Sequence, residues 1–495
     1  MIARFPHATA DGYTGVVFPY NIPRAKARAL KAAAAAARLD LVPAVMHNPH
    51  DPNYVEGVLA KDALFVARNG QGVLEPHRPA IANFDFERAN GHRFASWTLQ
   101  DAPGAATFAD HVVRRSGRTS LRIANLGRSQ RLNARVMQTI SLRPHRQYRV
   151  SFWVKTEGLA EGAPEVKVLA LDNRTFINFQ TFRTKPTQDW TEHSLVFNSF
   201  ERSRANLYVG YWHSADGTVW FDDIRIEEIG LVNVLRRPGC PVTVHGENGV
   251  VYEEGVDFEP IVDPALNPWK PDHASPPIRL TKATRIHEGD RLRVSYYHPV
   301  VVYEDRLTTC LSEEKIFEGW RDEVVTSNEL LQPAAFLMSH DELRVVNQCA
   351  RCQSKQLTPG QLLAWNVRRA AAIVREVRPD AGIWVWHDMF DPMVNAVDDY
   401  FAVHGSLRGS WEGLDPDVGI MNWSGGLLGK NAGFFADRGL KQMLAGYYDA
   451  DEDGAKMAAW LAATARTPGI VGAMYTTWED RYDAMSTWAK RVWGR

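Results

Sequence analysis

Residues 333–344 combine a short apolar run with charged side chains that could carry out acid–base chemistry. The run 334–338 has the composition of a buried strand, and the adjacent carboxylates of Asp341 and Glu342 follow it closely. Carboxylates at the end of a buried strand are costly to desolvate, and neighbouring ones repel each other. Both effects raise the pKa of a carboxyl group, which is how a general acid that works near neutral pH is made. The alternative is a solvated acidic pair that begins a loop.

Four later apolar segments also end in polar or aromatic side chains. They cover residues 382–386, 418–421, 443–446 and 471–474. The side chains at or just beyond their ends are Trp386, Asp388, Asn422, Trp423, Tyr447, Tyr448, Asp449, Trp478 and Asp480. Carboxylates supply acids and bases, and flat aromatic faces pack against sugar rings, so this combination favours a sugar-cleaving pocket. Aromatic residues alone would more often belong to a core.

Helical segments separate these strands. The clearest covers residues 358–378, where Thr358 and Gln361 fit a capping box and Pro359 occupies the first helical position. A second is expected at 453–465. Alternation of strands and helices is typical of a parallel (β/α) barrel, whose active sites lie at the carboxyl ends of the strands.

The predicted fold is therefore an α/β, TIM-type (β/α) barrel that is interrupted by an inserted antiparallel β-sandwich of jelly-roll type. Residues 13–18, 41–46 and 291–297 bring the barrel to eight strands with the five strands named above. If residues 291–297 belong to the insert instead, the barrel lacks one strand.

The pattern changes to short alternating strands with turn signals from about residue 81 to residue 228. We therefore expect four parts: residues 1–79 as the first part of the barrel, 80–228 as the sandwich, 229–290 as a connecting β-rich extension, and 291–495 as the remainder of the barrel with the catalytic site.

Composition excludes several other classes. The 495 residues carry a net charge of −1, which favours neither nucleic acid nor an anionic membrane as a partner. Four cysteines are too few for a disulfide framework, and Cys349-x-x-Cys352 has no second ligand pair at metal-site spacing. The first 20 residues do not resemble a signal peptide, so the protein is cytoplasmic, or exported with a signal that the numbered sequence lacks.

Several segments of the sandwich resemble carbohydrate-binding modules of the galactose-binding-like type. They are Asn83-Phe84-Asp85-Phe86-Glu87 and residues 117–122, 148–155 and 219–224. The resemblance implies a structural calcium site near Asn83–Glu87 and Asp222-Asp223.

The motifs His340-Asp341-Glu342, Trp386-x-Asp388-Met389, Tyr447-x-Asp449 and Trp478-x-Asp480 resemble the β-N-acetylhexosaminidases of glycoside hydrolase family twenty. The chain departs from that family in having Ser339-His340 in place of Gly-Gly, and its first strand offers no sugar-binding arginine.

The resemblance implies a role for each part of the site. The residue matching Glu342 protonates the leaving oxygen, the one matching Asp341 orients the 2-acetamido group of the substrate, and the one matching Tyr447 binds the acetamido oxygen. Substrate would be bound by His340, Arg344, Trp386, Asp388, Asn422, Trp423, Tyr447, Tyr448, Asp449, Trp478 and Asp480.

We thus predict an exo-acting glycoside hydrolase that removes a terminal hexosamine by a substrate-assisted retaining mechanism. It would act on an oligosaccharide or polysaccharide and need no metal or other cofactor for catalysis. One alternative is a retaining glycosidase in which Asp449 is the nucleophile and Glu342 the acid/base, with carboxyls about 5–5.5 Å apart. Another alternative is a polysaccharide-binding protein without catalytic activity.

Overall fold

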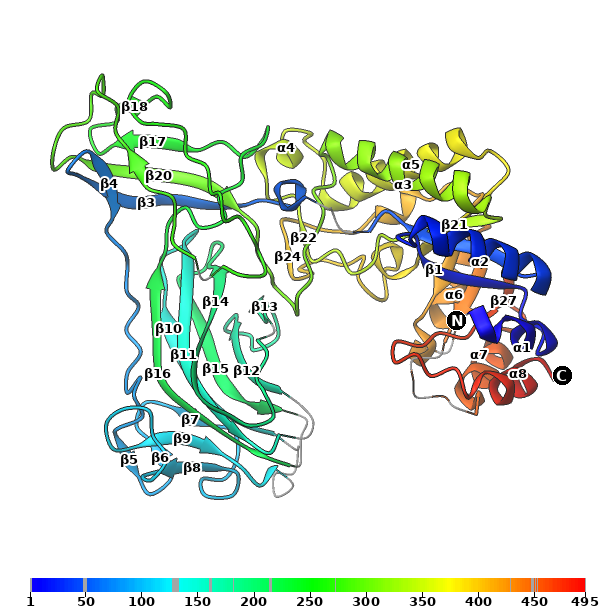
Figure 1. Cartoon of the computed structure of the whole chain (residues 1–495), viewed down its shortest axis with the longest axis horizontal. Helices are drawn as coiled ribbons and strands as arrows, with labels where there is room; N and C mark the ends of the chain where they lie inside the picture. Colours follow the sequence, from blue (N-terminus) through cyan, green and yellow to red (C-terminus); the bar gives the residue numbers. More distant parts are fainter. Residues whose placement is uncertain are drawn as a thin grey trace. The chain divides into compact units, whose positions relative to one another are not determined.

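The computed structural model describes residues 2–47, 51–126, 133–159, 163–180, 182–212, 216–271, 273–427, 429–446, 449, 451 and 453–494 (Figure 1). The chain divides into two units. Unit 1 contains Met1–His50, Thr309–Asn347 and Cys352–Arg495, and unit 2 contains Asp51–Thr308 and Gln348–Arg351.

A parallel sheet of seven strands forms the centre of unit 1. Each strand is followed in the sheet by the next one along the chain of this unit, as in repeated βα units. In sheet order the strands are β1 (Gly15–Pro19), β2 (Asp40–Val45), β21 (Ala335–Met338), β23 (Gly382–Trp386), β25 (Val418–Asn422), β26 (Gln442–Ala445) and β27 (Ile470–Met474). The five later strands lie within a residue or two of their predicted positions.

Helices connect these strands and precede and follow the sheet. Their bounds are α1 (Phe5–Ala10), α2 (Arg24–Ala37), α3 (Glu314–Leu331), α4 (Ala350–Gln353), α5 (Pro359–Val377), α6 (Lys430–Ala436), α7 (Ala455–Thr464) and α8 (Met485–Trp493). The capping box of α5 is confirmed, because Gln361 N–H donates to Thr358 Oγ1 and the Gln361 side chain accepts the Thr358 N–H. The local sequence therefore sets where this helix begins.

The predicted eighth barrel strand belongs to unit 2. Strand β20 (Arg291–His298) pairs antiparallel with β3 (Val58–Arg68), so the predictions that 291–297 and all of 1–79 are parts of the barrel were wrong. Leu292 and Val294 of β20 are buried and alternate with exposed arginines. That alternation suits an antiparallel sheet with one wet face, whereas strands of a parallel sheet are buried on both faces.

The described strands form no closed eight-stranded barrel. No backbone ladder joins β1 to β27 in the described part of the sheet. Instead, Tyr13, just before β1, stacks on Trp488 of α8 with ring centroids 6.2 Å apart and meets the edge of Trp493 at 4.7 Å. Side chains from both ends of the chain thus cover the outer strands of the sheet.

The predicted antiparallel sandwich is confirmed in unit 2. One sheet contains, in order, β13 (Phe176–Asn178), β12 (Ala163–Leu169), β15 (Arg204–Trp212), β10 (Asn133–Ser141) and β7 (Thr98–Leu99). The other contains β14 (Gln188–Asn198), β11 (Gln147–Glu157), β16 (Thr218–Glu228), β9 (Ser120–Ile123) and β8 (Thr107–Asp110). Fully buried side chains such as Phe152, Val166 and Val209 fill the space between the two sheets.

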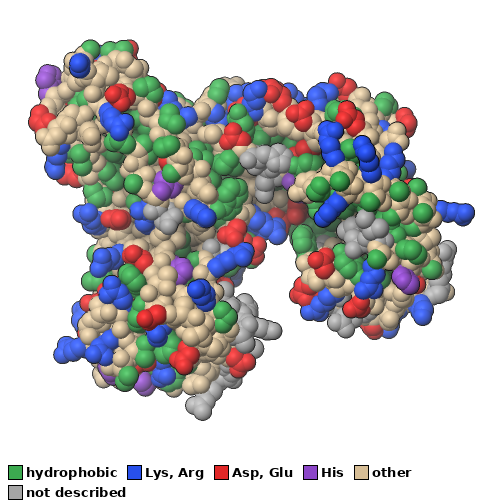
Figure 2. Space-filling model, viewed as in Figure 1, with side chains coloured by type: hydrophobic (Ala, Val, Ile, Leu, Met, Phe, Trp, Pro, Cys, Tyr) green, Lys and Arg blue, Asp and Glu red, His purple; other side chains and the backbone are tan. Residues whose placement is uncertain are grey.

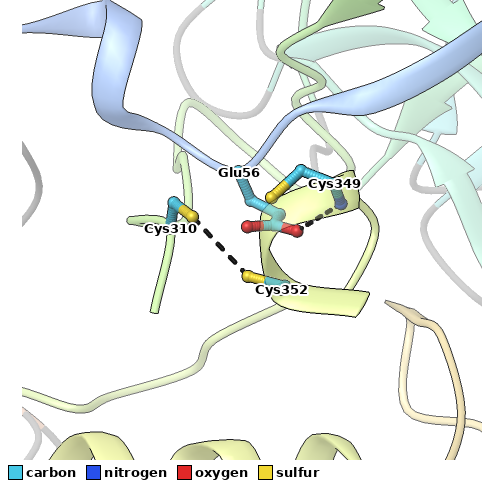
Figure 3. Close-up of side chains that lie close together, drawn as sticks. All are labelled: Glu56, Cys310, Cys349 and Cys352. Atoms are coloured by element: carbon cyan, nitrogen blue, oxygen red, sulfur yellow. Dashed lines mark hydrogen bonds between the residues drawn. The ribbon is translucent and has the colours of Figure 1, made fainter. Parts of the chain in front are cut away.

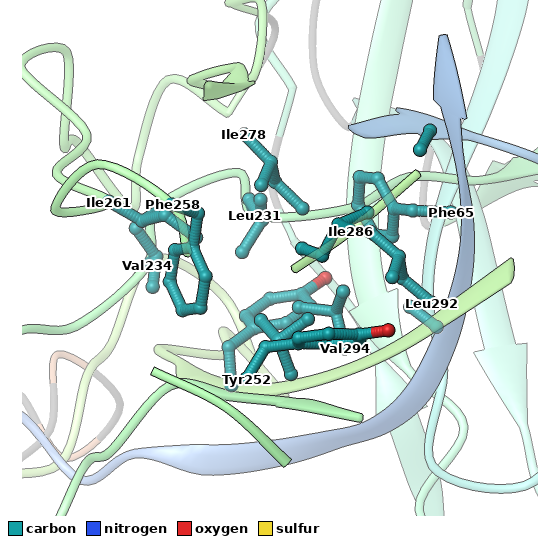
Figure 4. Close-up of a cluster of buried hydrophobic side chains, with 14 of the residues drawn as sticks. Phe65, Leu231, Val234, Tyr252, Phe258, Ile261, Ile278, Ile286, Leu292 and Val294 are labelled. Atoms are coloured by element: carbon teal, nitrogen blue, oxygen red, sulfur yellow. The ribbon is translucent and has the colours of Figure 1, made fainter. Parts of the chain in front are cut away.

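A third antiparallel sheet of unit 2 has six strands, and a further pair is formed by β5 (Ala89–Asn90) and β6 (Arg93–Phe94). The six-stranded sheet has the order β18 (Val251–Tyr252), β17 (Thr243–Gly246), β20, β3, β4 (Gln71–Leu74) and β19 (Ile278–Arg279). Figure 4 shows its core. Side chains of β3 and β20, such as Phe65 and Leu292, pack there with side chains of the segment 231–286, such as Phe258. The segment expected to be only a connection therefore has a core of its own.

Charged side chains of both signs are interspersed on the face shown in Figure 2, in keeping with the near-zero net charge. No helix among the described residues is long and apolar enough to cross a membrane.

Candidate functional site

The carboxyl ends of β21, β23, β25, β26 and β27 lie along one edge of the parallel sheet, because neighbouring strands run in the same direction. We call this the carboxyl edge. The predicted site residues that the structure describes lie at the ends of these strands or in the segments that follow them, so each of these segments starts from the carboxyl edge.

Asp341 and Glu342 occupy an unusual stretch of backbone after β21. His340 has φ 39° and Glu342 has φ 46°, values in the left-handed region that residues other than glycine rarely adopt. Such conformations cost about 1–3 kcal/mol each and occur often at functional sites. The charges of Asp341 and Glu342 both act to raise the pKa of Asp388. This backbone therefore brings the two carboxylates toward a common neighbour.

Asp388 is the buried member of this carboxylate group. Its Oδ2 accepts hydrogen bonds from the Glu342 backbone N–H (3.0 Å) and from Asn395 Nδ2 (2.8 Å). Burial, and next the nearby Asp341 carboxylate, raise the pKa of Asp388 well above its usual range. The Oδ1 atom of Asp388 has no hydrogen-bond partner among the described residues.

Sequence reasoning missed the contribution of the loop that follows Asp388. Asn395 reaches Asp388, and the burial-raised pKa of Tyr400 also responds to the charges of Asp388 and Glu342. Arg344 Nη2 lies 2.8 Å from Glu342 Oε2, and the Arg344 guanidinium carbon lies 5.2 Å from the ring centroid of Phe401. The adjacent aromatic pair 400–401 in an otherwise polar loop was the available signal.

Besides Asp388 and Arg344, two further predicted substrate-binding residues are buried. His340 is 4 % exposed, its Nε2 lies 2.9 Å from Asn366 Oδ1 of α5, and burial lowers its pKa to about 4. Asn422 is fully buried, and its Oδ1 accepts hydrogen bonds from Asn431 and from the Ser424 backbone. Both side chains hold the elements of unit 1 together.

His387, Ser424 and Asp391 lie near one another without forming a nucleophilic triad. His387 Nδ1 lies 3.4 Å from the Trp423 backbone N–H, and Nε2 lies 2.7 Å from Ser424 Oγ. Asp391 Oδ2 is 3.7 Å from the same Nε2. Ser424 Oγ and Asp391 Oδ2 both approach the same ring nitrogen, whereas in a Ser-His-Asp triad the serine and the carboxylate contact different nitrogens of the histidine.

A second carboxylate, Asp449, is held at the ends of β26 and β27. Its oxygens accept hydrogen bonds from Thr477 Oγ1 (2.5 Å), Trp478 N–H (2.8 Å) and Glu479 N–H (3.1 Å). Burial acts to raise the pKa of Asp449, but these hydrogen bonds outweigh it and lower the pKa. Asp449 is therefore ionised at neutral pH.

The other predicted residues at the carboxyl edge differ in exposure. Trp478 is 69 % exposed and Asp480 is also exposed, whereas Trp386 is half-buried in an apolar group with Leu337 and Met421. Trp423 packs edge-on against His387. Tyr447 and Tyr448 lie outside the described residues.

The thiols form one close contact in each unit. In unit 1, Cys310 Sγ and Cys352 Sγ are 3.6 Å apart. In unit 2, a hydrogen bond to Cys349, followed by burial, raises the pKa of the Cys240 thiol, and Glu56 Oε1 accepts the Cys349 N–H at 2.8 Å. Figure 3 shows the Cys310–Cys352 and Glu56–Cys349 contacts.

One sheet of the sandwich carries a polar and aromatic outer face. The ladders place Gly210 of β15 between Arg135 and Glu165, and Tyr208 between Met137 and Lys167. These side chains alternate with the buried ones, so they point away from the core.

Trp212, the last residue of β15, contacts charged side chains of both neighbouring strands on this face. Lys167 Nζ is 4.6 Å and the Arg135 guanidinium carbon 5.1 Å from the Trp212 ring centroid, and Lys167 also pairs with Glu165. A Cβ atom on Gly210 would come within 2.9 Å of the Trp212 ring, so only glycine leaves space for it. We call this group the Trp212 face.

The residues expected near a calcium ion make other contacts. Asp222 Oδ2 accepts the backbone N–H groups of Arg115 and Ser116, and Oδ1 accepts that of Asp223. Glu87 Oε1 accepts the backbone N–H groups of Arg118 and Thr119. These carboxylates thus bind the loop 115–119 to the sandwich.

Residues 79–214 match the family described as Carbohydrate binding domain (CBM_4_9). These residues form a carbohydrate-binding module. The match includes the whole Trp212 face and lies within unit 2.

Solved structures similar to the chain include three carbohydrate-binding modules. TmCBM61, solved with beta-1,4-galactotriose, has 16 % identity, covers 30 % of this chain and 98 % of its own, and gives a TM-score of 0.23. A CBM4 structure has 21 % identity, coverages of 30 % and 100 %, and a TM-score of 0.24. The CBM22-1 xylan-binding domain of Paenibacillus barcinonensis Xyn10C has 16 % identity, coverages of 33 % and 98 %, and a TM-score of 0.20. The search of curated proteins found no match.

Proposed function

We propose that the protein is a carbohydrate-active enzyme in which the module binds a saccharide and the carboxyl edge of unit 1 hydrolyses a glycosidic bond. The match of residues 79–214 to a carbohydrate-binding family carries the saccharide part of this proposal. The carboxylate group Asp341, Glu342 and Asp388 supports the hydrolytic part, because glycoside hydrolysis needs carboxyl groups in different protonation states.

In the mechanism that we favour, Glu342 is the general acid and base, and Asp341 stabilises a 2-acetamido group of the substrate as that group attacks the anomeric carbon. The product would be the hexosamine released from the end of the substrate. Asp388 is a positioning residue, because its Oδ2 accepts the Glu342 backbone N–H and so fixes the backbone that carries the acid/base carboxylate.

The alternative mechanism uses Asp449 as a covalent nucleophile. Its hydrogen bonds keep this carboxylate ionised, as a nucleophile must be. Asp449 follows β26, which is three strands from β21 in the sheet, or roughly 14 Å along a flat sheet. The two carboxyls of a retaining enzyme are about 5–5.5 Å apart, so this mechanism requires the sheet to curl strongly.

A panel of chromogenic aryl glycosides, including N-acetyl-β-glucosaminide and N-acetyl-β-galactosaminide, tests the proposal. Glu342→Gln should lower kcat by about 10²–10⁴-fold on any substrate that the protein hydrolyses. Glu318→Gln, at an exposed carboxylate of α3 that pairs with Lys315, is the matched control and should leave kcat unchanged. Binding of polysaccharide without turnover of any glycoside would instead make the protein a binding protein.

A further inference from the structure

Unit 2 contains a cavity of about 420 Å³ beside the edge strand β13. One side is formed by the loop after β13, with Phe179, Gln180 and Phe182. The other side is formed by residues 304–306, which lie outside the matched module. The cavity is within the range of about 300–1,000 Å³ that is usual for small-molecule sites.

Hydrogen bonds and ring contacts hold the outer wall against the module. Val301 O accepts Asn178 Nδ2 (2.8 Å), and Val302 O accepts the Phe179 N–H (3.0 Å). The ring of Tyr303 packs edge-on against Phe179 at 5.1 Å. The wall is therefore a fixed part of unit 2.

A second contact fixes the far end of this wall. Trp269 Nε1 donates to Asp305 O at 2.7 Å. Trp269 also lies outside the matched residues 79–214, so a second segment that follows the module holds the wall in place.

Gln180 shows that the cavity is suited to a polar ligand. The residue is only 7 % exposed and lines the cavity. Its backbone N–H donates to Asn178 Oδ1, which fixes the position of the residue beside β13. A side-chain amide can both donate a hydrogen bond to a ligand hydroxyl and accept one from it.

The charged lining favours a ligand without net charge. Glu165, Glu304 and Asp305 contribute carboxylates, and Arg183 and Arg306 contribute guanidiniums. The hydroxyl groups of a sugar can donate hydrogen bonds to the carboxylates and accept hydrogen bonds from the guanidiniums. An acidic sugar would bring its own carboxylate close to three others.

The aromatic lining adds apolar faces to this polar set. Phe179 and Phe182 both line the cavity, and Phe182 is held against Phe152 with ring centroids 4.9 Å apart. Lys167 Nζ lies 3.9 Å from the ring centroid of Phe179 and also contacts Trp212, so the cavity adjoins the Trp212 face.

We infer that this cavity binds a neutral sugar residue of the saccharide, and that residues 304–306 form a necessary wall of the site. The inference rests on the proposed function, in which a saccharide is the ligand of unit 2. It assigns part of the binding site to a segment outside the carbohydrate-binding module.

Isothermal titration of the full chain with cellohexaose, xylohexaose, laminarihexaose, chitohexaose, β-1,4-galactotriose and trigalacturonate tests the inference. We expect at least one neutral oligosaccharide to bind. Gln180→Ala, and the double variant Glu304→Ala/Arg306→Ala, should each weaken that binding about tenfold. The control Arg78→Ala/Glu227→Ala removes another exposed ion pair of unit 2 and should not change Kd.

The outcomes separate the two proposals. Binding that is unchanged in both cavity variants but lost in Lys167→Ala would overturn the cavity and leave saccharide binding by the module intact. Preferential binding of trigalacturonate would overturn the neutral class. No binding of any probe by the unaltered protein would count against both proposals. Since the 304/306 variant alters only exposed side chains, it remains informative if Gln180→Ala lowers the melting temperature.

Discussion

The two units gather polar side chains in different ways. In the parallel sheet of unit 1 all strands end at one edge, so carboxylates from distant segments, such as Asp341 and Asp388, meet there. In the antiparallel sandwich successive strands end at opposite edges, and the polar groups gather instead on a face, where Glu165 and Lys167 neutralise each other. An edge can therefore concentrate like charges and shift pKa values, whereas on this face two opposite charges of the same strand, β12, pair with each other.

The largest effect should come from breaking the charge cluster at the carboxyl edge. Asp341→Ala is expected to lower kcat on 2-acetamido substrates by three or more orders of magnitude, because the acetamido group loses its stabilising carboxylate. Steady-state kinetics of the Asp341→Ala and Asp449→Asn variants, measured side by side, gives the loss of kcat in each. A nearly silent Asp341→Ala with an inactive Asp449→Asn, and a fluoro-sugar trapped on Asp449, would favour the double-displacement mechanism.

A buried charge in the sandwich should make unit 2 sensitive to pH. Burial raises the pKa of Asp222 to about 7 in the folded state, from an ordinary value of 3.8. The neutral form is favoured by folding, so the stability that this group contributes is present below about pH 4 and is lost as pH rises toward 7. A shift of this size corresponds to as much as a few kcal/mol.

Asp222→Asn should therefore flatten the dependence of the unfolding free energy on pH between 4 and 7, as measured by urea denaturation. Asp189→Asn is the control. The Lys155 hydrogen bond lowers the pKa of exposed Asp189, so its removal should leave this pH range unaffected. An equal slope in the Asp222→Asn variant and the unaltered protein would contradict the expectation.

The packing of the Trp212 face should be disturbed by a single methyl group. Gly210→Ala would place Cβ 2.5 Å from Ala134 O and 2.8 Å from Arg135 Cγ, and we expect a loss of about 1–3 kcal/mol in unfolding free energy. Gly433→Ala in α6 has no atom within 4 Å of the new Cβ and should be neutral or slightly stabilising. Chemical denaturation of both variants compares a crowded glycine with an open one.

The smallest effect concerns the capping box in unit 1. Thr358→Ala should cost about 1 kcal/mol, because the Gln361 N–H loses its acceptor. Thr358→Ser keeps the oxygen and should retain most of the stability. Thermal melts would show the difference, and kcat should be unchanged in both variants because the cap does not touch the carboxyl edge.

Elements with strong local signals could be predicted from the sequence. The capping box of α5 and the apolar run of β21 depend on neighbouring residues only, and both lie where the sequence indicates. The sandwich was also predictable, because inward Val166 and Val168 alternate with outward Glu165 and Lys167 along β12.

Features that depend on distant partners could not be predicted in this way. The partner of β20 is β3, and no local property of residues 291–298 names that partner. The raised pKa belongs to Asp388, and it arises from the depth at which β23 ends and from the position of Asp341. Tyr400 and Asn395 reach the same group through a long loop whose path the sequence does not specify.

The long insert between β2 and β21 begins and ends at one point. The Glu56 N–H, near the start of unit 2, donates to Thr308 O at its end (2.7 Å), and β2 and β21 still pair in register at Ala44 and Leu337. A folded insert whose ends meet adds little more loop-closure entropy than a short turn would. In evolutionary terms, the segment 51–308 could be gained or lost in one recombination event without changing the strand order of the sheet that carries it.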